Sequence, residues 1–157
     1  MSKNYDIRSA TVADCEAIAA LMTQLNFEEG HAVATLPANI ASALFEPTRE
    51  VNLQSLVADR GGEIVGAMLY YAGYDTISAS YGFHLADIIV TKNHRHAGIG
   101  TALMKELAAR TLAQSKEWIS LTVLKRNARA QEFYLALGME PVEADFLAMG
   151  KTALARL

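Results

Sequence analysis

The chain has 157 residues, of which 52% are hydrophobic and 20% charged, and its formal net charge is −3. These values exclude an intrinsically disordered chain and indicate one globular domain, which we expect to span residues 1–157. A slightly acidic protein is also a poor match for the phosphate backbone of nucleic acids.

The ends and the cysteine content indicate a cellular compartment. The first residues lack the basic and apolar pattern of a signal peptide, and no apolar run reaches the roughly 18 residues of a membrane helix. The single cysteine, Cys15, has no partner for an internal disulfide and is expected to be buried in a helix. We therefore expect a cytoplasmic protein that binds neither membranes nor nucleic acid.

The first half of the chain predicts a strand, two helices and a hairpin. Residues 5–10 resemble a short strand, and residues 11–25 show helical apolar spacing after the capping residue Thr11. Residues 36–45 form a second helix with Pro37 in its first turn. Two apolar segments within 52–74 flank the turn DRGG, which is typical of a β-hairpin.

The second half alternates between strands and helices. We expect a strand over 81–90, a helix over 101–114, a strand over 118–124, a helix over 127–138 and a closing strand in 145–154. The first of these helices places Leu103, Met104, Leu107, Ala108 and Leu112 on one apolar face. The order predicts an α/β fold with a mixed sheet, covered by helices, and a parallel β-α-β crossover over residues 82–124.

The junction RHAGIG, residues 95–100, has the chemistry of a phosphate cradle. A helix N-terminus offers unpaired amides and a positive dipole end, and glycines at 98 and 100 let an anion approach the backbone. Arg95 adds donors suited to phosphate oxygens. A glycine turn without a ligand explains the same residues, and neither the dinucleotide fingerprint nor the P-loop spacing is present.

Two motifs in order resemble one enzyme family. Arg95, Gly98 and Gly100 match the R-x-x-G-x-G signature of the GNAT superfamily of N-acetyltransferases, and residues 127–139, NARAQEFYLALGM, resemble its second motif. Residues 7–18 and 64–90 look most like the diamine (spermidine/spermine) and thialysine acetyltransferase branch. The resemblance implies a GNAT-like, mostly antiparallel sheet with helices on both faces, and acetyl-CoA as co-substrate.

The resemblance also implies a coenzyme site and a direct attack by the amine, without a covalent enzyme intermediate. Tyr134 takes the position of the general acid that protonates the leaving sulfur, although it also reads as a packing residue beside Phe133. Asn127 caps its helix or bonds the pantetheine arm, and the two roles are compatible. The implied coenzyme contacts are Ile88, Ile89, Val90, Arg95, His96, Ala97, Gly98, Ile99, Gly100, Thr101, Asn127, Ala130 and Tyr134.

The general base stays open between three candidates. The branch carries two adjacent acidic residues before its apolar triplet, and this chain has Ala86 followed by Asp87. Because neighbouring strand residues point to opposite faces, we expect Asp87 opposite Ala86 and His84 on the same face as Ala86. His84 carries an imidazole, a common general base near neutral pH; a water chain is the third possibility.

The acceptor site is expected around Phe27, Glu28, Glu29 and Tyr81. The branch lines its acceptor site with an aromatic and acidic pair after the first helix, although a solvated acidic loop is the simpler explanation of the carboxylates. Tyr81 belongs to a tyrosine-rich region that lines an acceptor cleft or covers a dimer surface. His94 and His96 lack a third ligand at sensible spacing, so we expect no metal.

The sequence therefore predicts an acetyl-CoA-dependent N-acetyltransferase for a primary amine of a small polyamine or lysine-like acceptor. The alternatives are an acetyltransferase for a protein N-terminus, an amino acid or an aminoglycoside, and a non-catalytic acyl-CoA-binding sensor. A homodimer is expected from the resemblance alone.

Overall fold

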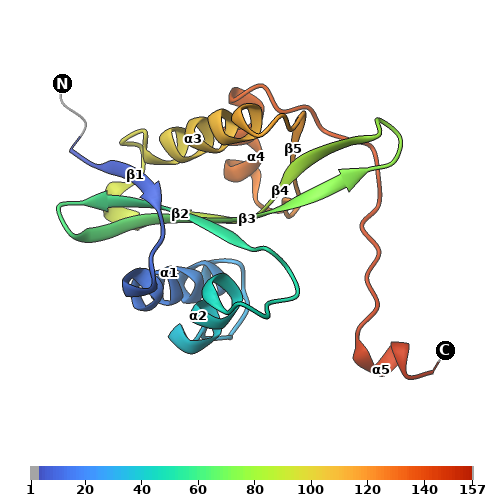
Figure 1. Ribbon diagram of the computed structural model, residues 1–157, viewed down its shortest axis with the longest axis horizontal. Coiled ribbons are helices and arrows are strands. Elements are labelled where there is room, and N and C mark those ends of the chain that lie inside the picture. Colours follow the sequence, from blue (N-terminus) through green and yellow to red (C-terminus); the bar gives the residue numbers. More distant parts are fainter. Residues whose placement is uncertain (1–3, 157) are drawn as a thin grey trace. The chain divides into compact units, whose positions relative to one another are not determined.

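A five-stranded sheet in the order β1-β2-β3-β4-β5 organises the first part of the chain (Figure 1). Its first four strands pair antiparallel, and β5 joins β4 in parallel, so the predicted mixed sheet and crossover are confirmed. The strands are β1 (Asp6–Ser9), β2 (Gln54–Arg60), β3 (Glu63–Asp75), β4 (Ser80–Val90) and β5 (Trp118–Leu121).

This computed structural model describes residues 4–156. Residues 1–3 and 157, the ends of the predicted domain, lie outside the described residues. The chain divides into two compact units, one ending at Thr122 and the other starting at Val123. That residues 1–157 form one domain stays a prediction.

Helices cover both faces of the sheet in the first unit (Figure 1). Helices α1 (Cys15–Glu28) and α2 (Pro37–Phe45) lie on one face and α3 (Ile99–Ala113) on the other. Beneath α1 and α2, the buried side chains of Ile18, Leu44, Val57 and Leu69 belong to one core cluster, which also includes Cys15 as expected. Burial of this apolar surface is the main force that holds the layers together.

The buried face of α3 differs by one position from the predicted one. Leu103, Met104 and Leu107 are buried as expected, but Leu112 is 75% exposed and Thr111 is buried in its place. The Thr111 hydroxyl donates to the backbone oxygen of Leu107 at 2.7 Å. Because this bond satisfies the hydroxyl within the helix, a threonine is tolerated where the apolar pattern alone favoured leucine.

An ion-pair network joins β1, the start of α1 and β2. The Arg8 guanidinium contacts Asp14 at 2.7 Å and Asp59 at 2.9 Å. The Asp14 carboxylate also accepts a bond from the backbone nitrogen of Thr11 at 2.7 Å. The hydrogen bond from Arg8 is the main reason why the pKa of Asp14 falls to about 2.

Two glycines make room for a tryptophan at the junction of β4 and β5. Gly73 and Gly82 are cross-strand partners, and Gly82 also pairs with Trp118. A Cβ atom at Gly82 would lie 2.0 Å from the indole, and one at Gly73 would lie 2.9 Å from it. The indole of Trp118 therefore lies directly on the backbone of the two strands.

The second unit contains helices α4 (Ala128–Ala136) and α5 (Lys151–Leu154). Helix α4 confirms the predicted helix, and Gly138, with φ of +88°, follows its end. The predicted strand over 145–154 is wrong, because these residues form no strand and the last four turn into α5. Phe146 and Leu147 are exposed, so this segment lacks the buried face that would stabilise a strand.

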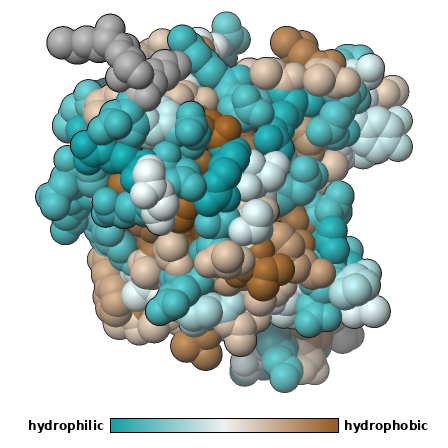
Figure 2. Space-filling model, turned by 60° about the vertical axis from the view of Figure 1, so that its left-hand side comes forward, coloured by the Kyte–Doolittle hydropathy of each residue, from teal (hydrophilic) through white to brown (hydrophobic). Residues whose placement is uncertain are grey.

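Hydrophobic residues lie in separate groups between hydrophilic ones on the face shown in Figure 2. Apolar atoms are common on protein surfaces, so such scattered groups need no special explanation. Among residues 4–156, no helix has the length and apolar character needed to cross a membrane.

Candidate active site

The loop between β4 and α3 presents free amides at the start of a long helix. Gly98 precedes α3 in a left-handed conformation, with φ of +79°, and it offers no side chain to cap the helix. The first bond within the helix runs from Ala102 N to Gly98 O at 2.9 Å. The amides of residues 99–101 precede that donor, so they are placed to bind an anion.

Arg95 is bound to an acidic residue of α1. Its Nη2 lies 2.7 and 2.8 Å from the two carboxylate oxygens of Glu28, and its Nε donates to Val90 O at 2.9 Å. Lys92 Nζ lies 3.9 Å from the same carboxylate. The sequence predicted Arg95 for phosphate and Glu28 for the acceptor, and the structure pairs the two.

Neighbouring side chains stabilise the negative charge of the Glu28 carboxylate. Burial favours the neutral carboxyl, but hydrogen bonds from Gln24 and Arg95 outweigh it and lower the pKa of Glu28. The ionised form of Glu28 holds the loop to the C-terminal end of α1. An ion pair between residues 67 positions apart, in which Arg95 Nη2 contacts both carboxylate oxygens, therefore fixes the position of the loop.

One edge of β4 is open beside this loop. The parallel ladder with β5 ends at the pair Leu85 and Leu121, whereas β4 continues to Val90. Within the described chain, the ladder leaves residues 86–90 unpaired on that side, and these include Ile88, Ile89 and Val90. Ile89 belongs to the buried core under α1, so its main chain, rather than its side chain, is suited to a ligand.

A β-bulge at Ala86 overturns the predicted orientation of Asp87. His84 pairs with Tyr71 and Asp87 pairs with Leu69, and the register shifts between Leu69 and Tyr70. Positions 69 and 71 of β3 share a face, so His84 and Asp87 share it too, which the alternation pattern had ruled out. Ala86 is the extra residue, which breaks the period of two.

The face that carries Asp87 is the one covered by α1 and α2, since its partner Leu69 belongs to that core. Burial raises the pKa of the Asp87 carboxyl above its usual value, and the negative charge of Glu29 raises it further. His84 bonds the Ser120 hydroxyl through Nδ1 at 3.0 Å, and its ring lies 5.2 Å from that of Tyr71. The two base candidates therefore occupy one side of the sheet.

An open groove of about 870 Å³ runs between α2, the segment after it, and β3. Tyr71, the aromatic neighbour of His84, lines this groove together with the carboxylate residues Glu46 and Glu50. Sequence reasoning missed both glutamates, because nothing in the segment EPTRE indicates that it borders a groove. Negative groups in such a place favour a cationic ligand.

Two predicted acceptor residues are exposed. Phe27 is exposed near the end of α1, and Tyr81 is exposed with its ring 4.8 Å from that of Tyr74. Tyr81 precedes Asp87 by six positions on β4, which corresponds to about 20 Å along a strand. The structure therefore does not bring Tyr81 together with Asp87.

The second unit carries the remaining predicted residues. The Asn127 side chain accepts a bond from Ala130 N at 3.1 Å, so the capping role predicted for Asn127 is confirmed. Tyr134 lies on α4, with its ring 5.3 Å from that of Phe133. Gln131 also binds the backbone oxygens of residues 124 and 125, which fixes the turn before α4.

The two histidines of the loop have different surroundings. His94 contacts Arg60 through Nε2 and Thr91 through Nδ1, each at 2.8 Å, so both ring nitrogens are engaged. His96 adopts a left-handed backbone conformation with φ of +63°. In the described part of the chain, no group of three or more histidine, cysteine, aspartate or glutamate residues could hold a metal ion.

Comparison with known proteins identifies a family. Residues 18–139 match the acetyltransferase (GNAT) family. A thialysine N-epsilon-acetyltransferase from Bos taurus is 36% identical over 81 residues, which cover 52% of this chain and 47% of that protein. An L-ornithine N5-acetyltransferase from Arabidopsis thaliana is 23% identical over 96 residues, covering 60% of this chain and 42% of that protein. The chain thus spans about half the length of the curated relatives that it matches.

Solved structures share the fold over nearly the whole chain. A possible acetyltransferase from Clostridium difficile 630 superposes with a TM-score of 0.81 at 20% identity, covering 93% of this chain and 97% of that one. A transcriptional regulator from Bacillus halodurans C-125 gives a TM-score of 0.78 at 26% identity, covering 93% and 99%.

Proposed function

Because the chain belongs to the acetyltransferase (GNAT) family, we propose that it transfers an acetyl group from acetyl-CoA to a primary amine of a small polyamine or lysine-like acceptor. The observation that carries the proposal is the uncapped start of α3 after Gly98, next to the open edge of β4. Amides at the helix start are suited to the pyrophosphate, and the open edge is suited to the amide-bearing pantetheine arm. As in the sequence analysis, a cytoplasmic homodimer is part of the proposal.

Asp87 is the general base in this proposal. The acceptor ammonium must lose a proton before its nitrogen can attack the thioester carbonyl. A carboxyl group whose pKa is raised by burial is better matched to this task than an ordinary aspartate. The bulge at Ala86 supports this role, because it turns Asp87 to the face that carries His84 and the groove at Tyr71.

The transfer then needs no enzyme nucleophile. The neutral amine nitrogen forms a bond to the acetyl carbon and the carbon–sulfur bond breaks. The thiolate of coenzyme A takes a proton from the hydroxyl of Tyr134, the role that the family motif implies for this residue. The nitrogen loses its second proton as the amide forms, and that proton restores the Tyr134 hydroxyl. Asp87 holds the proton taken from the amine and returns it to solvent.

The acceptor class follows from charge. Glu46 and Glu50 border the groove that ends at Tyr71, so they are suited to a second ammonium on the acceptor. The names of two relatives refer to thialysine and L-ornithine, which both carry more than one amino group. Arg49 also lines the groove, and its positive charge favours an acceptor with a carboxylate over a pure polyamine.

The function is tested by release of free thiol from acetyl-CoA in the presence of diamines, thialysine, ornithine, an aminoglycoside and an N-terminal peptide. We expect turnover with the diamines or amino acids, and a loss of at least about 100-fold for Tyr134→Phe with little change in coenzyme affinity. Tyr81→Phe, an exposed tyrosine on the other unit, is the matched control. Wild-type turnover in Tyr134→Phe removes that residue from the mechanism.

The base is tested by Asp87→Asn and His84→Gln in parallel. If Asp87 takes the proton, Asp87→Asn loses turnover and the rise of kcat/KM with pH, whereas His84→Gln retains both. The reverse result assigns the base to His84. Retention of the pH profile in both variants favours a water chain.

A sensor that binds acyl-CoA without catalysis is the second candidate, because Ala86 stands where the diamine branch has its first carboxylate. Calorimetry that detects acetyl-CoA binding, with no thiol released on any amine, would favour the sensor. Calorimetry that detects no binding would refute both functions.

A further inference from the structure

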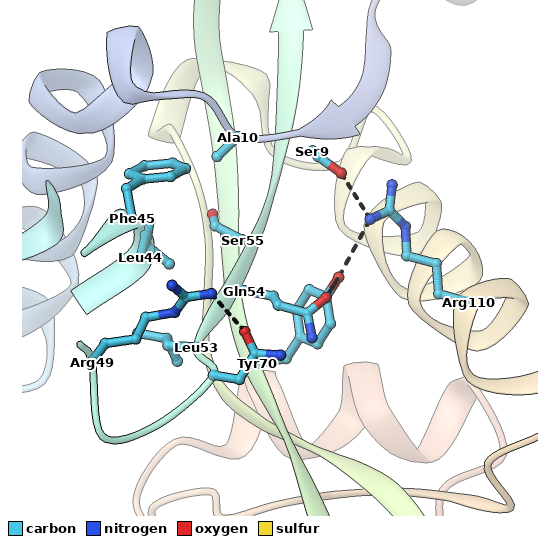
Figure 3. A pocket seen from close by; sticks show the side chains of 11 residues that line it. Ser9, Ala10, Leu44, Phe45, Arg49, Leu53, Gln54, Ser55, Tyr70 and Arg110 are labelled. Carbon is cyan, nitrogen blue, oxygen red and sulfur yellow. Dashed lines mark hydrogen bonds between the residues drawn. The ribbon is translucent and has the colours of Figure 1, made fainter. Parts of the chain in front are cut away.

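A cavity of about 140 Å³ lies at the end of the sheet away from the phosphate loop (Figure 3). Its walls come from the end of α2, the segment over residues 46–53, the start of β2, and Tyr70 and Arg110. Arg110 follows Gly98 by twelve positions along α3, which corresponds to about 18 Å. The cavity is therefore separate from the start of α3.

The charged groups of this cavity are both positive. Arg49 and Arg110 enter from opposite sides, with Tyr70 and Gln54 between them (Figure 3). None of the residues that line the cavity is acidic. Glu106 pairs with Arg110 at 2.9 Å from the preceding turn of α3, so it offsets only one of the two charges.

Two polar groups at the cavity are poorly satisfied. Arg49 Nε is buried and has no hydrogen-bond partner among the described residues, although its two terminal nitrogens bind Glu46 O and Asn52 Oδ1. Tyr70 is fully buried, and among residues 4–156 its hydroxyl has partners only at 3.4 Å, on Gln54, and at 3.5 Å, on Arg110. Such distances are at the limit of a hydrogen bond, and buried polar groups usually have better ones.

The other residues that line the cavity limit the size and polarity of a ligand. Leu44, Phe45 and Leu53 provide an apolar wall opposite the polar groups. An engineered cavity of about 150 Å³ holds one benzene molecule, so this one has room for a few carbon atoms beside an anionic group. Guanidinium groups match a carboxylate with paired donors.

We propose that this cavity is a second ligand site, which binds a small monocarboxylate with a short apolar tail. The carboxylate lies between Arg49 and Arg110 and accepts a bond from the Tyr70 hydroxyl, and the tail lies against Leu44 and Phe45. Arg49 and Leu53 also line the groove proposed for the acceptor, whereas Tyr70 and Arg110 line this cavity and not that groove. The proposal therefore differs from the acetyl-transfer site in Tyr70 and Arg110.

The test is calorimetric titration of the whole protein with butyrate at constant ionic strength, with neutral butyramide as the matched ligand. We expect one site for butyrate and at least tenfold weaker binding of butyramide, because the amide lacks the charge. Arg49→Gln and Tyr70→Phe should each weaken butyrate binding tenfold or more. Arg156→Gln, an exposed arginine of the second unit, should bind as wild type does.

Three results would overturn the proposal: no binding of butyrate, equal binding of butyramide, or unchanged affinity in Arg49→Gln. Because Tyr70 is buried, Tyr70→Phe is first checked for a cooperative unfolding transition. If that transition is lost, Arg49→Lys is measured in place of Tyr70→Phe. Asp87→Asn should retain butyrate affinity. A loss in that variant would assign butyrate to the acetyl-transfer site and refute a second site.

Discussion

Neutralising Glu28 should loosen the loop between β4 and α3 and reveal what Arg95 does. Opposite charges about 4 Å apart attract by ~4 kcal/mol at an effective dielectric constant of 20, but desolvation and side-chain ordering cancel much of this. Exposed ion pairs contribute a net stabilisation of only ~0.2–1 kcal/mol. Arg95 and Glu28 are only 18% and 29% exposed and bind through two contacts. We therefore expect a coupling of about 1–1.5 kcal/mol.

The assay is a double-mutant cycle of Glu28→Gln and Arg95→Gln, measured by urea unfolding. Each single variant should lower the free energy of unfolding by at least about 1 kcal/mol, which corresponds to a Tm lower by ~2–4 °C. Arg95→Gln should lower the free energy of unfolding more than Glu28→Gln does, because it also loses the hydrogen bond to Val90 O. The double variant should cost less than the sum of the two.

Lys92 provides the matched control, because it faces the same carboxylate at 3.9 Å with 70% of its side chain exposed. We expect Glu28→Gln and Lys92→Gln to be additive within about 0.3 kcal/mol. If Glu28→Gln and Arg95→Gln were additive as well, the ion pair would hold nothing in place. Arg95 would then be a phosphate ligand only, and its variant would lose coenzyme affinity without losing stability.

Three further outcomes are expected. The low pKa of Asp14 stabilises the fold above pH ~4, so stability should decline by roughly 2 kcal/mol as the pH falls towards 2, and Asp14→Asn should flatten that decline in pH-dependent unfolding. Gly82→Ala should abolish a cooperative transition, because its methyl group would overlap Trp118, whereas Gly138→Ala, in open space at positive φ, should cost only about 1 kcal/mol. Asp87→Asn should raise Tm at neutral pH. Because folding raises the pKa of the Asp87 carboxyl, the ionised carboxylate destabilises the folded state at pH values above that pKa, and the neutral amide removes this penalty. A lower Tm would mean that Asp87 makes contacts that stabilise the fold.

Local patterns in the sequence were sufficient for most elements of the fold. The 3.6-residue spacing after Thr11, the proline at position 37 and the glycines of DRGG each reflect interactions within a few residues. Helix α2 begins at Pro37 as expected, and Gly61 and Gly62 both adopt positive φ in the hairpin turn. The strand–loop–helix order also predicted the parallel crossover correctly, because that connection has few alternatives.

Features that depend on distant partners could not be predicted. No residue in LAD indicates the bulge at Ala86, yet one extra residue changes the face of Asp87. Glu28 and Arg95 lie 67 positions apart, so only the packing of α1 against the sheet brings them together. The apolar residues after Asp145 resembled a strand, but Phe146 and Leu147 are exposed, and a strand also needs a face that is buried by other elements.

The position of Trp118 has a practical consequence. It is the only tryptophan of the chain, and its indole lies where β5 begins to pair with β4, four positions before the unpaired edge of β4 begins at Ala86. Its fluorescence is therefore a natural optical reporter of this parallel pairing. Unfolding can be followed from this one emitter, and no dye has to be attached to the protein.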